Sequence, residues 1–143
     1  MSLESDLATM SRIPLEAFND GNLAVVDEVV AEDFVEHAPM PPGTPSGIAG
    51  LKAFITALRA AFPDQHYDVL RSVSQGDTHV LYVKNSGTMT GDFMGMPASG
   101  KHASWDEVHI ARAAGGKLVE HWQVIDQLSM LQQLGFIPEP QAV

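Results

Sequence analysis

Two histidines and a glutamate, His109, His121 and Glu107, have the side chains needed for a proton-transfer site. An imidazole has an unperturbed pKa of about 6.5, so it can accept or donate a proton near neutral pH. Two neighbouring imidazoles disfavour each other's protonation, which keeps at least one of them neutral and basic. A nearby carboxylate can orient or acidify its histidine partner. These residue types predict general acid–base chemistry, provided that the fold brings them together.

Residues 104–125, with the sequence SWDEVHIARAAGGKLVEHWQVI, are typical of a β-hairpin. Such a hairpin would bring the two histidines and the glutamate together. The tip, residues 114–116, has a glycine where a three-residue hairpin loop needs a left-handed residue. The cross-strand pairs expected from this loop are Ala113 with Lys117, His109 with His121, and Glu107 with Gln123. A two-residue Gly-Gly turn would instead shift the pairing by one, and the histidines would no longer share a face.

The two faces of this predicted hairpin differ in polarity, because alternate residues of a strand point to opposite sides. Trp105 lies on the face of the two histidines. The other face carries the apolar residues Val108, Ile110, Leu118, Trp122 and Val124. The polar face either lines a pocket or is a solvent-facing surface, and the alternation alone fits both.

A metal site is the first alternative for these side chains. His109 and His121 with Glu107 or His37 would supply ligands of the kind found in zinc and iron sites. The chain has no H-x-H or H-E-x-x-H spacing, so we expect no metal. It also has no cysteine, no phosphate-binding loop ending in GK[ST] and no G-x-S-x-G nucleophile elbow, which argues against thiolate, phosphate-loop and serine-hydrolase chemistry.

The composition predicts one acidic domain over residues 1–143. Hydrophobic residues make up 45% of the chain and charged residues 18%, as in an ordinary globular protein. The formal net charge of −10 argues against nucleic acid and anionic membranes as partners, since both favour Lys/Arg clusters. The N-terminus has no secretory signal pattern, and no apolar run is long enough to cross a membrane. We therefore expect a soluble cytoplasmic protein.

The hydrophobic periodicity changes from helical to strand-like along the chain. Helices are expected at 4–19 with a kink at Pro14, at 23–30, from 46 or 47 to 62, and at 127–134. Strands are expected at 34–37, 67–74, 78–85, 87–93, 101–112 and 117–125. Helices, then strands, then a last helix indicate an α+β domain. A mostly antiparallel sheet that curls around the helices would leave a pocket between the layers, and its apolar outer face would support a homodimer through the sheet.

We expect the pocket to bind a small hydrophobic molecule. Its predicted binding residues are His37, Trp105, Gln123, Phe93, Phe54 and Phe18. His37 precedes a proline-rich loop, which would place it at the mouth of the cavity, although a loop histidine bonded to backbone is the alternative. Phe93 lies in a glycine-rich, methionine-rich stretch that would serve as a flexible lid or as ordinary core. His79 and His102 are expected near strand ends, exposed to solvent.

Five short motifs, in order, resemble the SnoaL-like polyketide cyclase family. They are F-V-E-H-A-P at 34–39, A-F-P-D at 61–64, G-T-M-T-G-D-F-M-G-M-P at 87–97, G-K-L-V-E-H-W at 116–122 and L-Q-Q-L-G at 131–135. The resemblance implies the cone-shaped α+β fold of ketosteroid isomerase and nuclear transport factor 2, a deep hydrophobic cavity and usually a dimer. The characterised cyclases close a ring by intramolecular aldol condensation with a His/Asp pair and no cofactor. Transferred to this chain, the pair falls on His109 and His121, while Gln123 stands where relatives often have Asp.

An aldol ring closure needs a base beside a carbonyl and an acid for the developing oxyanion. Our hypothesis assigns His121 as general base, His109 as acid or orienting residue, and Glu107 as their electrostatic partner. The enzyme would need no cofactor. Two alternatives stay open: a non-catalytic carrier or sensor of small ligands that uses the same cavity, and a dimeric interaction module with a filled core.

Overall fold

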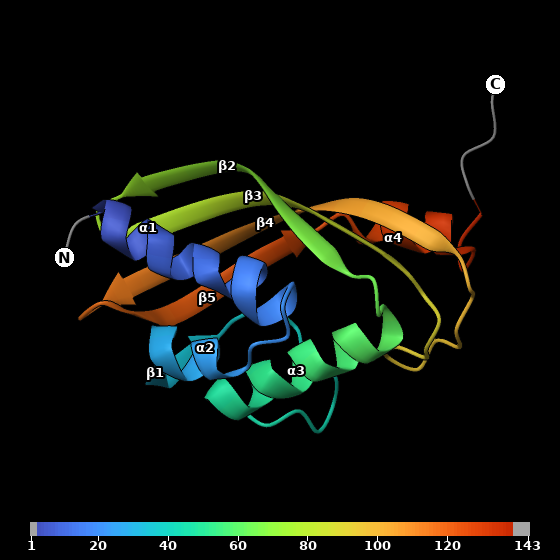
Figure 1. Cartoon of the computed structure of the whole chain (residues 1–143), viewed down its shortest axis with the longest axis horizontal. Coiled ribbons are helices and arrows are strands. Elements are labelled where there is room, and N and C mark those ends of the chain that lie inside the picture. Colours follow the sequence, from blue (N-terminus) through green and yellow to red (C-terminus); the bar gives the residue numbers. More distant parts are fainter. Residues whose placement is uncertain (1–2, 139–143) are drawn as a thin grey trace.

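A computed structural model describes residues 3–138 of the chain (Figure 1). In chain order the elements are helix α1 (Leu3–Arg12), π-helix η1 (Ile13–Phe18), helix α2 (Ala24–Val29), strand β1 (Val30–Glu36), helix α3 (Gly47–Ala61), strands β2 (His66–Gln75), β3 (Thr78–Thr88), β4 (His102–Ala114) and β5 (Lys117–Ile125), and helix α4 (Gln127–Leu134). This order confirms the predicted α+β class.

The strands form one five-stranded sheet in the order β1-β5-β4-β3-β2. All neighbours pair antiparallel except β1, which runs parallel to β5. In Figure 1 the sheet curves behind α1, α2 and α3, which cover one of its faces. Helix α4 lies toward the right-hand end of the long strands, away from the N-terminus of α1. The inner strand residues and the helices form the apolar core, in which Ile55, Phe62 and Leu81 are almost completely buried. Each such side chain contributes about 1.5–3 kcal/mol through its burial.

The N-terminal helix changes its geometry at the predicted kink. Pro14 has no N–H to donate within a helix, so a regular α-helix cannot continue unchanged through it. The α-helix ends at Arg12, and the chain continues as a π-helix in which the backbone N–H of Asn19 bonds to the carbonyl of Pro14 at 3.1 Å. This wider turn buries Phe18.

The predicted strand at 87–93 is wrong beyond Thr88, where β3 ends. The backbone N–H groups of Thr90 and Gly91 instead bond to the carbonyl of Ala61, each at 3.0 Å. A Cβ at Gly91 would lie 2.9 Å from the carbonyl oxygen of Ala60. The loop therefore lies against the C-terminal end of α3, and this contact satisfies backbone groups that a strand would have paired within a ladder.

The prediction that His79 is exposed is also wrong, because its side chain is fully buried. Alternation along β3 places it on the inner face with Leu81 and Val83, both buried. Its Nδ1 lies 2.7 Å from the Ser74 hydroxyl, and its Nε2 faces a carboxylate oxygen of Asp6 on α1 at 3.9 Å. The position near a strand end suggested exposure, but α1 covers this end of the sheet (Figure 1).

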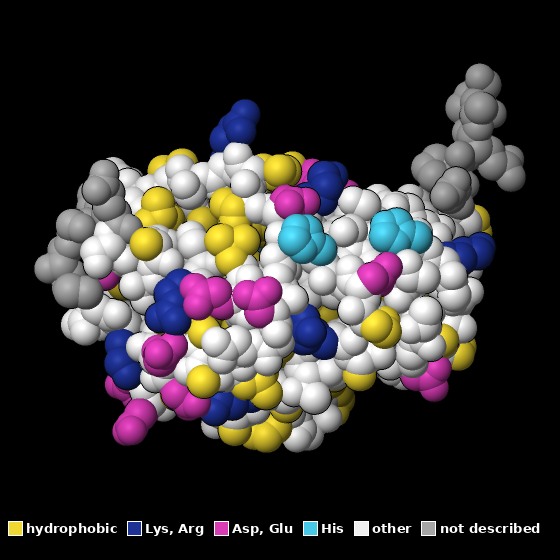
Figure 2. Space-filling model, viewed as in Figure 1, with side chains coloured by type: hydrophobic (Ala, Val, Ile, Leu, Met, Phe, Trp, Pro, Cys, Tyr) yellow, Lys and Arg dark blue, Asp and Glu magenta, His cyan; other side chains and the backbone are white. Residues whose placement is uncertain are grey.

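Charged side chains of both signs stand side by side on the helical face of the molecule. Figure 2 shows this mixture over α2 and its surroundings. Ion pairs join Arg12 to Glu28 at 2.9 Å and Lys52 to Asp27 at 2.6 Å. These pairs are largely exposed, so each contributes at most about 1 kcal/mol to stability. Among the described residues, no helix combines the length and apolarity needed to span a membrane.

The outer face of the sheet carries two apolar rows across the strands. The residues that form them are Val73, Val80, Ile110 and Trp122 in one row, and Tyr82, Val108 and Val124 in the other. Val124 is 72% exposed and Trp122 37% exposed. An open apolar surface of this kind is typical of a protein–protein contact. The homodimer through the sheet stays a prediction, and these two rows are the surface that it would bury.

Replacing Val124 with Asp should convert this dimer to monomer, because a carboxylate would be desolvated in the interface. We expect analytical ultracentrifugation to give a dimer for the wild type and a monomer for V124D. Leu15, an exposed apolar residue of η1 in the helical layer, supplies the control. L15D should sediment as the wild type does, and a monomeric wild type would contradict the prediction.

Candidate functional site

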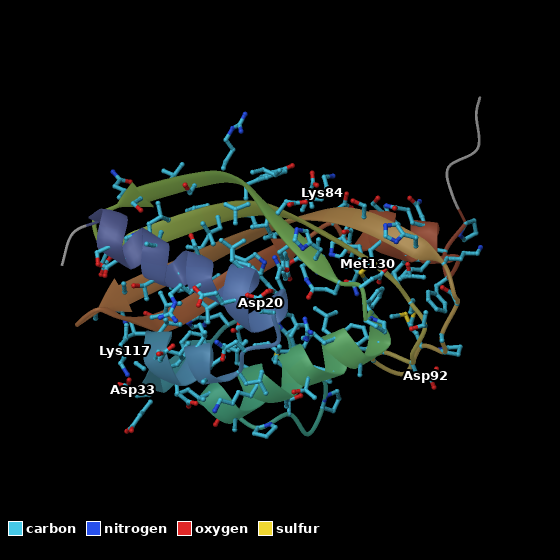
Figure 3. The ribbon with its side chains drawn as sticks, viewed as in Figure 1. Asp20, Asp33, Lys84, Asp92, Lys117 and Met130 are labelled. Carbon is cyan, nitrogen blue, oxygen red and sulfur yellow. The ribbon has the colours of Figure 1, made fainter. Side chains whose placement is uncertain are left out.

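A pocket of about 350 Å³ lies between the inner face of the sheet and the helices. This volume is within the range of small-molecule sites in proteins. Its wall is mostly apolar and includes the aromatic side chains of Phe18, Phe34, Phe54, Phe62 and Phe93. Met130 reaches it from α4 and is labelled in Figure 3. One region of the wall is polar, and it is built from β1, β4 and β5.

The β4–β5 hairpin provides most of this polar wall, in a register that differs from the predicted one. Gly115 and Gly116 form a two-residue turn with φ values of 60° and 80°, and Ala114 rather than Ala113 faces Lys117. Two positive φ angles in a two-residue loop fit a type I′ turn. The directly paired residues are His109 with Gln123, Ala111 with His121, and Glu107 with Ile125.

A β-bulge restores the arrangement that this turn alone would have lost. The register shifts again between Arg112 and Ala113, where Val119 is the extra residue of β5. The turn and the bulge each displace the pairing by one residue, and two such displacements return a side chain to its original face. His109 and His121 therefore share the inner face as diagonal neighbours. The prediction for Leu118 is wrong, since it is buried and lines the pocket instead of lying on the outer face.

The two imidazoles are in direct contact. Nδ1 of His109 lies 2.9 Å from Nε2 of His121. The ring centroids are 5.1 Å apart and the planes are inclined by only 23°, so the rings meet edge to edge. Their side chains are 17% and 19% exposed. The inter-ring contact is thus an in-plane hydrogen bond in a mostly buried setting.

Glu107 lies at one end of this pair and is 3% exposed. Its carboxylate accepts hydrogen bonds from Nε2 of His109 at 2.7 Å, the Tyr67 hydroxyl at 2.8 Å and the Trp105 indole N–H at 2.7 Å. The Asn85 amide adds a longer bond of 3.4 Å. Burial raises the pKa of Glu107, but the hydrogen bonds and the charge of His109 outweigh burial and leave this pKa below its ordinary value. Glu107 is therefore a buried, ionised acceptor.

Glu36 lies at the other end of the pair and was not among the predicted site residues. Its two carboxylate oxygens lie 2.6 and 2.8 Å from Nδ1 of His121. The backbone N–H of Ala38 also donates to it at 3.0 Å. Strand alternation is the signal that could have found it, because Glu36 follows the buried Phe34 by two residues and shares its face. Tyr67 and Asn85, which were also not among the predicted site residues, lie on inner strand positions in the same way.

The structure brings most of the predicted binding residues to the pocket. Those that line it are Trp105, Gln123, Phe93, Phe54 and Phe18. His37 does not, and its predicted place at the mouth is wrong. Because residues alternate along a strand, His37 points away from Glu36 to the outer face, where its ring stacks on Trp122 at 4.7 Å and bonds to Glu120 at 2.8 Å.

Two acidic side chains belong to this wall. Glu36 and Glu107 line the pocket, whereas no Lys or Arg of residues 3–138 does so. Lys84 and Lys117, labelled in Figure 3, lie at the periphery of the molecule. Within the same part of the chain, no group of three or more His, Cys, Asp and Glu side chains is arranged to hold a metal ion. The geometry can move protons on an uncharged or cationic ligand, and it offers no Lys or Arg from the described residues to an anionic ligand.

The pKa of His121 is lowered from its ordinary 6.5. Burial is the main cause and the charge of His109 adds to it, while Glu36 opposes both without reversing them. An NMR titration should therefore place the His121 midpoint below 6.5. Below that pH the unfolded chain binds more protons than the folded one, so the free energy of unfolding should fall as the pH is lowered through this window. H121Q should lose this part of the pH dependence, and a midpoint above 6.5 would contradict the prediction.

The chain is similar in sequence to known proteins. A family model described as SnoaL-like polyketide cyclase matches residues 8–134. Nogalonic acid methyl ester cyclase from Streptomyces nogalater is 28% identical over 122 residues, which cover 85% of this chain and 91% of that protein. Aklanonic acid methyl ester cyclase DnrD from Streptomyces peucetius is 30% identical over 141 residues, with 94% and 92% covered.

Solved structures show the same fold. TsrD from Streptomyces laurentii superimposes with a TM-score of 0.87 at 26% identity, over 96% of this chain and 99% of that one. IdmH from Streptomyces antibioticus gives a TM-score of 0.78 at 34% identity, over 91% and 98%.

Proposed function

The chain belongs to the SnoaL-like polyketide cyclase family, and from this premise we propose that it closes a ring in a hydrophobic, polyketide-type carbonyl compound by cofactor-independent acid–base catalysis. The observation that carries the proposal is the unbroken chain of hydrogen bonds Glu36–His121–His109–Glu107 along the wall of an apolar pocket. A hydrophobic substrate would fill the apolar part of the pocket, and its carbonyl groups would face the imidazoles.

The proposed reaction is an intramolecular aldol addition, in which no atom is lost. Nε2 of His121 removes a proton from the carbon next to one carbonyl, and the resulting enolate attacks a second carbonyl to form the new carbon–carbon bond. The alkoxide so formed takes a proton from His109. Nε2 of His121 faces His109 in the free protein, so the inter-ring hydrogen bond opens when the substrate binds. Glu107 stabilises the positive charge on the histidine pair.

Gln123 supports a histidine as the base. It lies directly across from His109 in the β-ladder, at the position where the family resemblance implies an Asp, and an amide cannot accept the proton. In this chain the carboxylates on the inner face instead lie at positions 36 and 107, each bonded to one of the imidazoles. They can polarise the imidazoles, and proton abstraction is left to His121.

The carboxylates also favour a neutral substrate, because a free acid would meet two like charges, and no Lys or Arg of residues 3–138 lines the pocket to offset them. Incubation with aklanonic or nogalonic acid methyl ester tests the proposal. We expect a product of unchanged mass with one more ring, and binding of the corresponding free acid weaker by at least about tenfold, equivalent to ~1.4 kcal/mol.

A non-catalytic carrier is the second candidate, since aromatic side chains dominate the wall of the pocket. Tight binding of both esters with no turnover would favour the carrier over the cyclase. Neither binding nor turnover with either ester would reject a polyketide-type ligand of this kind.

A further inference from the structure

We propose that His109 and His121 share one proton in the resting protein, and that Glu36 is the positioning residue that decides which imidazole accepts a proton and which donates one. The part that concerns catalysis rests on the proposed function. The part that concerns the resting protein does not, because it follows from the hydrogen bonds of the free chain.

The proton count follows from the partners of the four ring nitrogens. Nε2 of His109 faces the ionised Glu107 at 2.7 Å, and a carboxylate can only accept, so this nitrogen carries a proton. Nδ1 of His121 faces both oxygens of Glu36 at 2.6 and 2.8 Å. One of these oxygens also accepts the backbone N–H of Ala38, so Glu36 acts as an acceptor and Nδ1 carries a second proton. The two remaining nitrogens lie 2.9 Å apart, and two lone pairs at that distance would repel each other. A third proton must therefore lie between the rings.

Three protons on two imidazoles make one neutral ring and one imidazolium. His121 is the neutral ring, since burial lowers its pKa and the charge of His109 lowers it further. His109 is then the imidazolium and donates from Nδ1 to Nε2 of His121. With two carboxylates and one imidazolium, the four side chains carry a net charge of −1.

This protonation state lets the pair perform both proton transfers without solvent. When the inter-ring bond opens, His121 presents a lone pair at Nε2 and His109 presents a proton at Nδ1. The proton from the substrate carbon goes to Nε2 of His121, and the proton on Nδ1 of His109 goes to the product alkoxide. The pair ends with three protons, and renewed contact of the rings restores the starting arrangement. Protons balance over the whole reaction.

Glu36 sets this direction because the fold holds it rigidly against His121. The two residues are register partners across the parallel β1–β5 pair. The backbone N–H of His37 donates to the His121 carbonyl at 2.9 Å, and that of Ala38 donates to the Glu36 carboxylate at 3.0 Å. The side chain of Glu36 is only 16% exposed. With Nδ1 of His121 bonded to Glu36, only Nε2 is left to act as the base.

Long-range ¹H–¹⁵N NMR on the ligand-free full chain, labelled with ¹⁵N-histidine, tests the proton count near pH 7. We expect His109 protonated on both nitrogens, and His121 protonated on Nδ1 with Nε2 unprotonated or sharing the bridging proton. Two protons over the two rings, or protonation of His121 at Nε2 alone, would overturn the inference.

Glu36→Gln tests the positioning role. An amide can donate as well as accept, so it no longer selects the Nδ1–H form of His121. We expect a mixture of His121 tautomers by NMR and a kcat lower by roughly 10²-fold or more with KM little changed; the carboxylate-to-amide change in a Ser-His-Asp triad costs about 10⁴. Glu32→Gln, an exposed site on the same strand, is the matched control and should match the wild type in both measurements.

The two proposals fail in different ways. Three ring protons without ester turnover would leave the shared proton standing and reject the cyclase. Ester turnover with only two ring protons would support the cyclase and reject the shared proton. An E36Q protein with the wild-type tautomer and unchanged kcat would remove Glu36 from its positioning role. If E36Q does not fold, the wild-type NMR spectrum still decides the proton count, and E36D, which keeps the charge, should retain Nδ1 protonation.

Discussion

Replacing His121 with alanine should lower kcat for ring closure of the methyl ester by about 10²–10⁴-fold, the usual contribution of one general base. The substitution removes the lone pair at Nε2 and leaves the Glu36 carboxylate without its imidazole partner. Binding of the ester should change less than kcat, because the apolar wall of the pocket is untouched. Product formation under saturating substrate measures the effect.

His102→Ala is the matched control for this experiment. His102 is also a strand histidine, but its side chain is 60% exposed and it does not line the pocket. H102A should therefore keep wild-type kcat. Unchanged turnover in H121A would remove this histidine from the reaction and leave a carboxylate of the same wall, Glu36 or Glu107, as the candidate base.

Replacing Glu107 with alanine should lower the free energy of unfolding by about 3–5 kcal/mol, as expected when one partner of a buried charge pair is removed. The His109 imidazole, the Tyr67 hydroxyl and the Trp105 indole N–H would all lose their acceptor. Since small domains are stable by only about 5–15 kcal/mol, this is a large fraction of the total. Urea denaturation followed by tryptophan fluorescence measures it.

The exposed Glu32 provides the control, and E32A should stay within about 0.5 kcal/mol of the wild type. If E107A lost as little unfolding free energy as E32A, the stabilising role of the hydrogen bonds to Glu107 would be contradicted. The free energy of unfolding of E107Q should lie between those of the wild type and E107A. Its amide oxygen still accepts hydrogen bonds, whereas its NH₂ group faces donors.

The same residue predicts an acid dependence. The pKa of Glu107 is lower in the folded protein than its ordinary 4.5. Its stabilising contribution is therefore complete above that pH and is lost as the pH falls through the lowered folded value. The difference in unfolding free energy between wild type and E107Q should shrink as the pH is lowered below 4.5. A difference that stays constant with pH would contradict this assignment.

Elements whose ends depend on nearby residues could be predicted from the sequence. The last helix begins and ends where expected, because the Asp126 side chain accepts the backbone N–H of Ser129 and Gly135 adopts the left-handed conformation at the other end. The irregularity at Pro14 was predicted for the same reason. The N–H group that proline lacks and the caps at the two ends of α4 each depend on a few neighbouring residues, so the local sequence is enough to predict them.

The hairpin register could not be predicted in this way. The glycine tip suggested a loop length, but the final pairing depends on the bulge at Val119, and nothing in the local sequence marks it. The common face of His109 and His121 was predicted correctly, although the directly paired residues were not. A strand face repeats every two residues, so two single-residue displacements changed the partners and preserved the face.

The amino-acid sequence by itself determined the α+β class, the apolar wall and the presence of imidazoles on the β4–β5 hairpin, because these depend on periodicity and on contacts between near neighbours. Tertiary structure alone decided that β1 pairs with β5, which brings Glu36 to His121, and that His79 lies under α1. Both outcomes require segments far apart in the chain to pair or pack, and such long-range contacts leave no mark in the spacing of nearby residues.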